Sequence, residues 1–158
     1  MKLIPITNIG SYYLMEELVF LKTIRRSEVI VEISDARSYG DLKENSEYIS
    51  AREEQGFIED RIQKIENILM NSQIVDIFSY INDGKIIFGS TVILFNFNIK
   101  RNVIYKIVGF DEVDLKYNKI SLKSPIAKFL IGRFEGEIVN SNTPSGFVRY
   151  FVLKVSYL

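Results

Sequence analysis

The sequence predicts an α+β protein: an N-terminal antiparallel coiled-coil hairpin of residues 1–76, followed by a small antiparallel β domain of residues 80–158 with one short helix. Apolar residues recur every three or four positions in the first half of the 158-residue chain, and every second position in the second half. The net charge of zero divides in the same way. Residues 1–76 carry nine Lys or Arg against fourteen Asp or Glu, a balance of −5, whereas residues 77–158 carry eleven against six, a balance of +5. We therefore expect two units with different roles.

The first helix is expected to begin at a cap on Thr7 or Asn8 and to reach Arg37, because no proline interrupts this stretch. The spacing of its apolar residues is irregular near Arg25, so it indicates a coiled-coil seam of moderate regularity. The stripe consists of Leu14, Leu18, Leu21, Ile24, Ile30 and Ile33.

A second helix is expected from near Leu42 to beyond Leu69. Its apolar residues step by four, three and four, which is the 3.5-residue repeat of a coiled coil; they are Ile58, Ile62, Ile65 and Leu69. Between the two helices, Gly40 can adopt the positive φ that ends the first, and Asp41 can cap the second. Such a short connection makes the two helices antiparallel, with the hairpin tip near residues 37–48.

The second half is rich in β-branched and aromatic residues, punctuated by glycine, and predicts strands at residues 86–88, 91–97, 103–108 and 147–155. One short helix fits Pro125–Ile131. Ser124 is its expected N-cap, Pro125 its first residue, and Gly132 lies just past its end.

The composition excludes several kinds of chemistry. The chain has no Cys and no His, so disulfides, thiolate nucleophiles, imidazole bases and the usual zinc sites are excluded. The N-terminus lacks the pattern of a signal peptide, and no apolar stretch is long enough to span a membrane. We therefore expect a cytoplasmic protein without a membrane partner, in which any metal is bound by oxygen ligands.

The predicted tip holds the candidate site. Asp41 and Glu44 are three residues apart at the expected start of a helix, so both can face one Mg²⁺ ion whose other ligands come from elsewhere. The alternative is that they only cap the helix and complement its dipole. Arg37 and Arg52, one on each arm, can hold RNA phosphate or can be paired with glutamates.

The densest motif of the chain is GDLKENSEY at residues 40–48, followed by AREEQG at 51–56. Shorter motifs are IPIT at 4–7, FGSTV at 88–92, SPIA at 124–127, LIG at 130–132 and TPSG at 143–146. Together they resemble the Gre transcript-cleavage factors of bacterial RNA polymerase, the GreA/GreB family, along essentially the whole chain. The resemblance implies that the β domain is FKBP-like.

It also implies a function. Factors of this family insert the hairpin into the secondary channel of RNA polymerase, where the 3′ end of backtracked RNA lies. By resemblance, Asp41 and Glu44 help to hold a catalytic Mg²⁺ shared with the polymerase, and Arg37 and Arg52 contact the RNA. Ser124 and Pro125 would dock on the channel rim. The implied role is to stimulate cleavage by the polymerase, so the protein would not itself be an enzyme.

Two other functions are considered. A regulator that occupies the same channel without supporting cleavage would be expected to have an altered tip, whereas both acids are intact here. A peptidyl-prolyl isomerase or chaperone activity of the β domain would follow only from its fold, and fold does not determine function.

Overall fold

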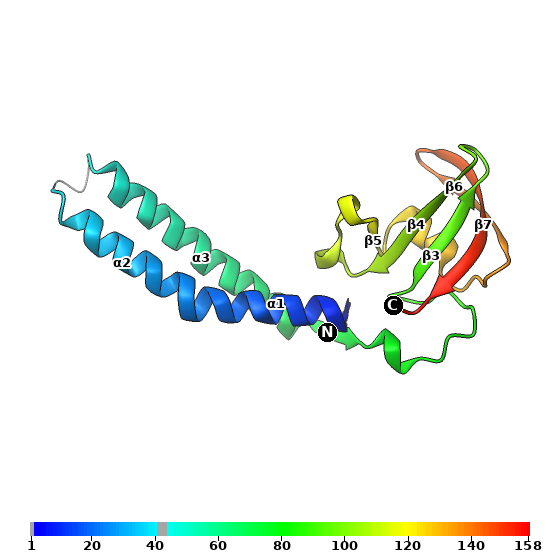
Figure 1. The fold of residues 1–158 in the computed structure, drawn as a ribbon, viewed down its shortest axis with the longest axis horizontal. Coiled ribbons are helices and arrows are strands. Elements are labelled where there is room, and N and C mark those ends of the chain that lie inside the picture. Colours follow the sequence, from blue (N-terminus) through cyan, green and yellow to red (C-terminus); the bar gives the residue numbers. More distant parts are fainter. Residues whose placement is uncertain (1, 41–43) are drawn as a thin grey trace. The chain divides into compact units, whose positions relative to one another are not determined.

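The computed structural model describes residues 2–40 and 44–158, and it confirms the predicted α+β class (Figure 1). The N-terminal elements are β1 (Ile4–Thr7), α1 (Asn8–Phe20), the π-helical segment η1 (Leu21–Arg25), α2 (Arg26–Arg37) and α3 (Ser46–Met70). They are followed by β2 (Ser72–Val75), η2 (Ile77–Ser79), β3 (Thr91–Asn96), β4 (Arg101–Val108), η3 (Phe110–Glu112), η4 (Leu115–Tyr117), β5 (Lys119–Ser121), α4 (Pro125–Leu130), β6 (Ile138–Thr143) and β7 (Gly146–Ser156).

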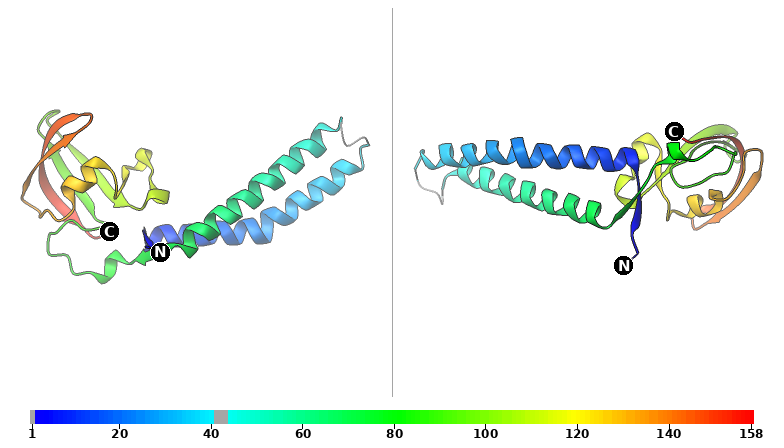
Figure 2. Two further views of the ribbon diagram at one scale, coloured as in Figure 1. Left: turned by 180° about the vertical axis from the view of Figure 1, so that it is seen from behind. Right: turned by 90° about the horizontal axis from the view of Figure 1, so that it is seen from below.

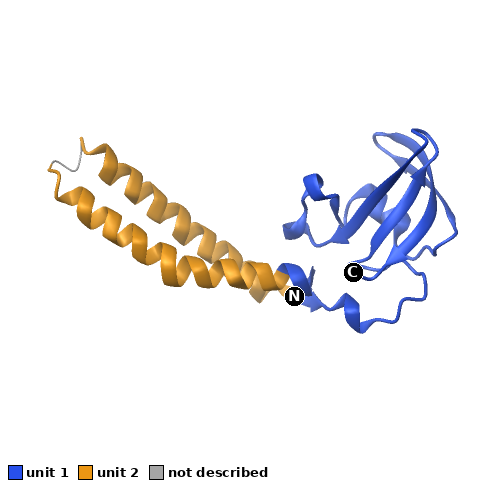
Figure 3. Ribbon diagram, viewed as in Figure 1, with its two compact units in different colours: residues 1–10, 73–158 blue, residues 11–72 orange. Residues whose placement is uncertain are grey.

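The chain divides into two compact units (Figure 3). The hairpin unit comprises residues 11–72, and the β unit comprises residues 1–10 and 73–158. Residues 2–10, which the sequence-based division groups with the hairpin, thus cluster with the β half of the chain. Strand β1 pairs with β2 in a two-stranded sheet there.

The hairpin unit is held together by an apolar seam between its two arms. Figure 2 shows α2 and α3 side by side from two further directions. The predicted stripe of the second arm is confirmed: Ile58, Ile62 and Ile65 are buried, and Leu69 packs beside them. Their partners from the first arm are Leu14, Leu18, Leu21 and Val29.

The first arm is interrupted by η1, where the sequence pattern is irregular. The buried residues of α2 are Val29, Ile33 and Ala36, which confirms the predicted place of Ile33 in the stripe. Ile24, within η1, and Ile30, in α2, are about half exposed, so their predicted place in the stripe is wrong. A π turn contains one residue more than an α turn, and this extra residue shifts every later position around the helix. The repeat of Leu14, Leu18 and Leu21 would continue at Glu28 and Glu32 in an uninterrupted α-helix, whereas the buried residues beyond η1 are Val29 and Ile33, each one position later.

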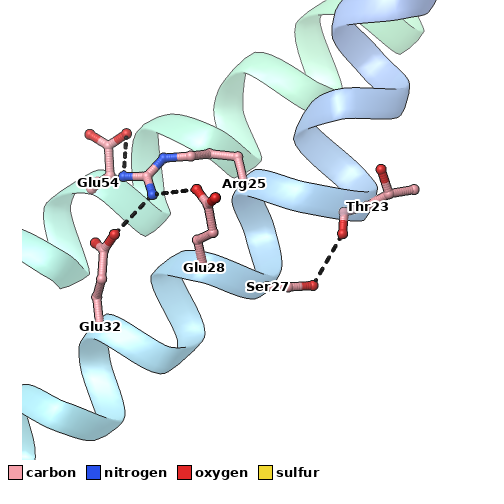
Figure 4. Close-up of polar contacts among 6 residues, drawn as sticks. All are labelled: Thr23, Arg25, Ser27, Glu28, Glu32 and Glu54. Carbon is pink, nitrogen blue, oxygen red and sulfur yellow. Dashed lines mark hydrogen bonds and ion pairs between the residues drawn. The ribbon is translucent and has the colours of Figure 1, made fainter.

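Ion pairs flank the seam (Figure 4). Arg25, at the end of η1, contacts Glu28 at 3.2 Å and Glu32 at 2.9 Å on its own arm, and Glu54 of α3 at 3.5 Å. The hydrogen bond to Glu32, followed by that to Glu28, raises the pKa of Arg25 above its ordinary value. Further pairs across the two arms are Lys22–Glu66, Arg26–Glu59 and Arg61–Glu17. Such exposed pairs favour one register of the arms but contribute little stability singly.

The Glu17–Arg61 pair makes a testable contribution to acid stability. The hydrogen bond from Arg61, at 2.6 Å, lowers the pKa of the Glu17 carboxyl below its ordinary value. A lowered folded-state pKa stabilises the fold above the unfolded pKa, and this contribution is lost as the pH falls through the folded value. We expect Glu17→Gln to reduce the loss of hairpin stability between about pH 7 and about pH 3. Denaturant melts followed by circular dichroism would measure this, with Glu53→Gln at an exposed site as the control; an equal loss in both variants would contradict it.

The β unit is built on a curled five-stranded sheet in the order β5-β4-β3-β7-β6. Neighbouring strands are antiparallel except β4 and β5, which are parallel. Helix α4 packs on this sheet through Ala127 and Leu130, both fully buried; the strands of the sheet are seen in Figure 1. The core they join includes Val92, Leu94, Ile107, Val139 and Val152.

Parts of the predicted strand pattern are wrong. Residues 86–88 are not a strand: Ile86 is buried, and its backbone N–H donates to the carbonyl of Arg133 at 2.7 Å in an irregular segment. Strands β5 and β6 were not expected from the sequence. The sequence of β6 is IVNSNT, and because it is mostly polar it lacks the alternation of apolar and polar residues by which a strand is recognised. Helix α4 lies where it was predicted and ends one residue earlier.

Candidate functional site

The hairpin tip lies between the end of α2 at Arg37 and the start of α3 at Ser46. Asp41 lies outside the residues that the structure describes. Glu44 is exposed in a turn before α3, so its predicted position within the first helical turn is wrong. The helix starts later than expected because its N-cap is Asn45. The backbone of Asn45 is extended and not helical, as is usual for an N-cap, so the helix begins at Ser46. Gly40, with φ of 123°, has the positive φ expected of it.

Asn45 joins the two arms beside Glu44. Its Oδ1 accepts the N–H of Tyr48 at 3.1 Å, which caps α3. Its Nδ2 donates to the carbonyl of Ala36 at 2.5 Å, near the end of α2. One side chain thus satisfies a free N–H of one helix and a carbonyl of the other. The cap is Asn45 and not Asp41, which the sequence pattern favours; the contact of Asn45 with Ala36 joins segments nine residues apart and has no signature in the spacing.

The two candidate RNA-contacting arginines lie one on each arm, as predicted. Arg37 is exposed, and its guanidinium carbon lies 5.9 Å from the centre of the Tyr48 ring, within the range of a cation–π contact. Arg52 is exposed on α3 and donates to Gln55 at 2.8 Å. Tyr39, which is 72 % exposed, offers an aromatic face next to the tip.

Below the tip, a cavity of about 600 Å³ opens on the hairpin. It is lined by residues of both arms, with four carboxylates and one guanidinium: Glu32, Asp35, Glu47, Glu54 and Arg25. This acidic lining disfavours phosphate groups.

Removing the Asn45 side chain should loosen the tip. We expect Asn45→Ala to destabilise the hairpin by about 1 kcal/mol, the typical effect of losing an N-cap. Asn45→Ser should retain the cap but lose the bond to Ala36, and so separate the two contributions. Thermal unfolding followed by circular dichroism measures both, with the exposed Ser50→Ala as the control. Equal stability of Asn45→Ala and the wild type would show that the cap is dispensable.

Ser124 and Pro125 lie at the start of α4 in the β unit. Ser124 is the N-cap, as predicted: its Oγ accepts the N–H of Ala127 at 3.3 Å, and Pro125 is the first helical residue and is exposed. Beside them is a cavity of about 380 Å³. Pro125, Ile126, Tyr105, Pro144 and Tyr150 are among the residues that line it.

Neither a metal cluster nor a membrane span is found in the described part of the chain. Within residues 2–40 and 44–158, no three carboxylates are gathered as they are around a metal ion. No helix in the same ranges has the length and apolarity needed to cross a bilayer.

Comparisons with known proteins cover both units. Residues 4–74 match the family model described as "Transcription elongation factor, N-terminal", and residues 81–157 match "Transcription elongation factor, GreA/GreB, C-term". Transcription elongation factor GreA of Haemophilus influenzae is 51 % identical over 158 residues, covering all of both chains. That of Buchnera aphidicola is 52 % identical, covering 99 % of this chain and 98 % of the other. Among solved structures, the GreA factor homolog 1 protein of Thermus thermophilus covers 98 % of this chain at 24 % identity, with 99 % of its own length matched and a TM-score of 0.43.

Proposed function

The chain belongs to the GreA/GreB family of transcription elongation factors, and from this we propose that it rescues backtracked RNA polymerase by stimulating cleavage of the nascent RNA. It is a transcription elongation factor whose partner is RNA polymerase. The observation that carries the finer proposal is the tip: the motif GDLKENSEY contains both acids, Asp41 and Glu44, and Glu44 is exposed before the start of α3.

The hairpin suits delivery of these acids into a narrow channel. Helix α3 has 25 residues, which at 1.5 Å per residue span roughly 37 Å. The two arms of the hairpin are joined by an apolar seam and by ion pairs beside it, which hold them paired along their length. We propose that the tip enters the secondary channel of the polymerase and reaches the 3′ end of the backtracked RNA.

The tip residues fit a role at a shared Mg²⁺. Carboxylate oxygens are the ligands Mg²⁺ prefers, and it takes one or two of them while keeping water or phosphate in its other positions. When bound, the ion stabilises the attacking or leaving oxygen of phosphodiester hydrolysis. Asp41 and Glu44 would hold it together with polymerase ligands and orient the attacking water. Two carboxylates cannot hold the ion by themselves, so the protein alone would cleave nothing, and the polymerase is the enzyme.

The remaining predicted contacts serve binding. Arg37 and Arg52 are exposed guanidinium groups that would contact RNA phosphate on either side of the tip. Ser124 and Pro125 would dock on the rim of the channel. The exposed ring of Pro125 and the adjoining cavity support this, because together they offer an apolar surface next to a helix start. Such a role places the protein in the cytoplasm.

The experiment uses a stalled, backtracked RNA polymerase complex with 5′-labelled RNA and Mg²⁺. Adding the protein should shorten the RNA rapidly, whereas free RNA incubated with the protein alone should stay intact. Binding without shortening would contradict cleavage stimulation and would indicate a regulator that only occupies the channel.

A further inference from the structure

Helix α1 begins with half of a capping box: the cap residue bonds to the first turn, but no side chain of that turn accepts the N–H of the cap residue in return. Thr7 is the N-cap: it is 3 % exposed, and its Oγ1 accepts the N–H of Gly10 at 3.0 Å. In a capping box, the residue in the position of Gly10 is Glu or Gln, and its side chain accepts the N–H of the cap in return. Glycine has no side chain, so the N–H of the buried Thr7 needs an acceptor from another part of the chain.

Glu112 supplies that acceptor from a position 105 residues away. Its Oε2 accepts the N–H of Thr7 at 3.0 Å, and its Oε1 accepts the Thr7 hydroxyl. Oε2 also accepts the N–H of Gly109 at 2.9 Å, which fixes the carboxylate on its own turn, η3. The two halves of this capping box therefore come from distant parts of the sequence.

Two glycines leave the space for this arrangement. A Cβ on Gly10 would lie 2.0 Å from Oε1 of Glu112, so any side chain there must displace the carboxylate. A Cβ on Gly109 would lie 2.5 Å from the carbonyl oxygen of Pro5, in strand β1. Glycine within a helix is unfavourable by itself. Its presence at position 10 is explained by the carboxylate that occupies the place of its side chain.

The anchored turn is the start of the hairpin's first arm. Residues 1–10 belong to the β unit, and α1 continues from Gly10 into the hairpin unit without a break. Strand β1, which ends at Thr7, pairs with β2, which follows the second arm. Thr7 thus directly precedes the first arm in the chain, on a strand that pairs with the strand following the second arm.

We propose that Glu112 is a positioning residue for transcript cleavage. By holding Thr7 and the first turn of α1, it limits how far the hairpin can swing relative to a β unit docked on the polymerase. The tip acids then reach the catalytic site in one position. This inference rests on the proposed function above.

The test separates positioning from binding. Glu112→Ala removes the acceptor, Glu112→Gln restores one, and Gly10→Ala displaces the carboxylate while favouring the helix. At saturating protein, the first and third variants should lower the maximal rate of RNA shortening by about tenfold to a hundredfold, the loss that a displacement of about 1 Å causes at a reacting centre. The concentration giving half the effect should stay within about twofold, and Glu112→Gln should restore most of the rate.

Matched controls are Asp111→Ala, which removes the exposed neighbouring carboxylate, and Gly56→Ala, which makes the same change in α3 where a Cβ meets nothing within 4 Å. Both should cleave at the wild-type rate. If Glu112→Ala fails to fold, the maximal rate of Gly10→Ala decides whether the contact between Glu112 and Thr7 matters for cleavage. Unchanged maximal rates in both variants would overturn the proposal, and so would a loss confined to the half-maximal concentration.

A second measurement does not depend on cleavage. Because the chain has no cysteine, spin labels can be attached to Glu53→Cys on α3 and Asn142→Cys on β6, both exposed. The distance distribution between the labels should broaden in Glu112→Ala and Gly10→Ala but not in Glu112→Gln. Equal widths in all variants would overturn the proposal. If the wild type does not stimulate cleavage, the proposed function fails, and the label widths still decide whether Glu112 restrains the hairpin.

Discussion

Replacing both tip acids, in the variant Asp41→Asn with Glu44→Gln, is expected to abolish stimulation of transcript cleavage while leaving binding to RNA polymerase intact. The substitutions keep the size of both side chains but remove the two negative charges proposed to hold Mg²⁺. Losing a single group that stabilises charge in a transition state typically lowers a rate by about a hundredfold to a thousandfold, so losing two should lower it by at least about a hundredfold. The measurement is the rate of RNA shortening in backtracked complexes at saturating protein.

The matched control is Glu47→Gln, which removes a neighbouring exposed charge in the first turn of α3. It should cleave at close to the wild-type rate, because Glu47 faces the acidic cavity below the tip. Full cleavage activity in the double variant would show that the metal role is assigned to the wrong residues. A double variant that no longer binds would move the role of the two acids from catalysis to docking.

Ile65→Ala should produce the largest loss of stability in the hairpin. Ile65 is 0 % exposed and lies in the seam with Leu18, Leu21 and Ile62. Truncating a fully buried isoleucine costs about 2–5 kcal/mol, from lost burial and from the cavity left behind. Denaturant unfolding followed by far-ultraviolet circular dichroism reports this loss, because most of the helical signal comes from the hairpin.

Ile49→Ala makes the same substitution on the same helix at a site that is 43 % exposed, and it should be much less destabilising. A loss below about 1 kcal/mol for Ile65→Ala would mean that the seam around this residue collapses to fill the space or is less tightly packed than described.

The success of the sequence analysis differs between the two arms for a physical reason. In α3 the repeat of Ile58, Ile62 and Ile65 runs through an uninterrupted α-helix, so counting positions identifies the buried face. In the first arm, counting on from Leu21 leads to Glu28 and Glu32, whereas the buried residues beyond η1 are Val29 and Ile33, each one position later. Periodicity assumes a constant number of residues per turn, and a π turn breaks that assumption.

In the β unit, local composition was a weaker guide. The cap and first turn of α4 were predictable, since Ser124 and Pro125 act through their nearest neighbours. The apolar run at 86–88 is buried without being a strand, whereas the polar run Ile138–Thr143 is one. Pairing with β7 decides the second case, and no window of a few residues contains that information.

In the candidate site too, residues marked by a local pattern were predicted, whereas residues whose partners are distant in the sequence were not. Spacing singled out Asp41 and Glu44 and placed the arginines on opposite arms, and family resemblance supplied the roles proposed for them. Asn45 and Glu112 were not identified because their partners, Ala36 and Thr7, lie 9 and 105 residues away. Residues whose role is to hold distant segments together become visible only in the folded chain.

The π turn at η1 also has a consequence for changing the number of residues in the first arm of the hairpin. A coiled coil is ordinarily lengthened or shortened in whole heptads, since smaller changes rotate the seam away from its partner. Here one arm holds an extra residue and the buried stripe still continues on both sides, from Leu21 to Val29. Deleting one residue within η1 should therefore yield a continuous α-helix that keeps the same buried stripe, with Val29 one heptad after Leu21. At this one place the hairpin should tolerate the loss of a single amino acid, where an uninterrupted coiled coil would have to lose a whole heptad.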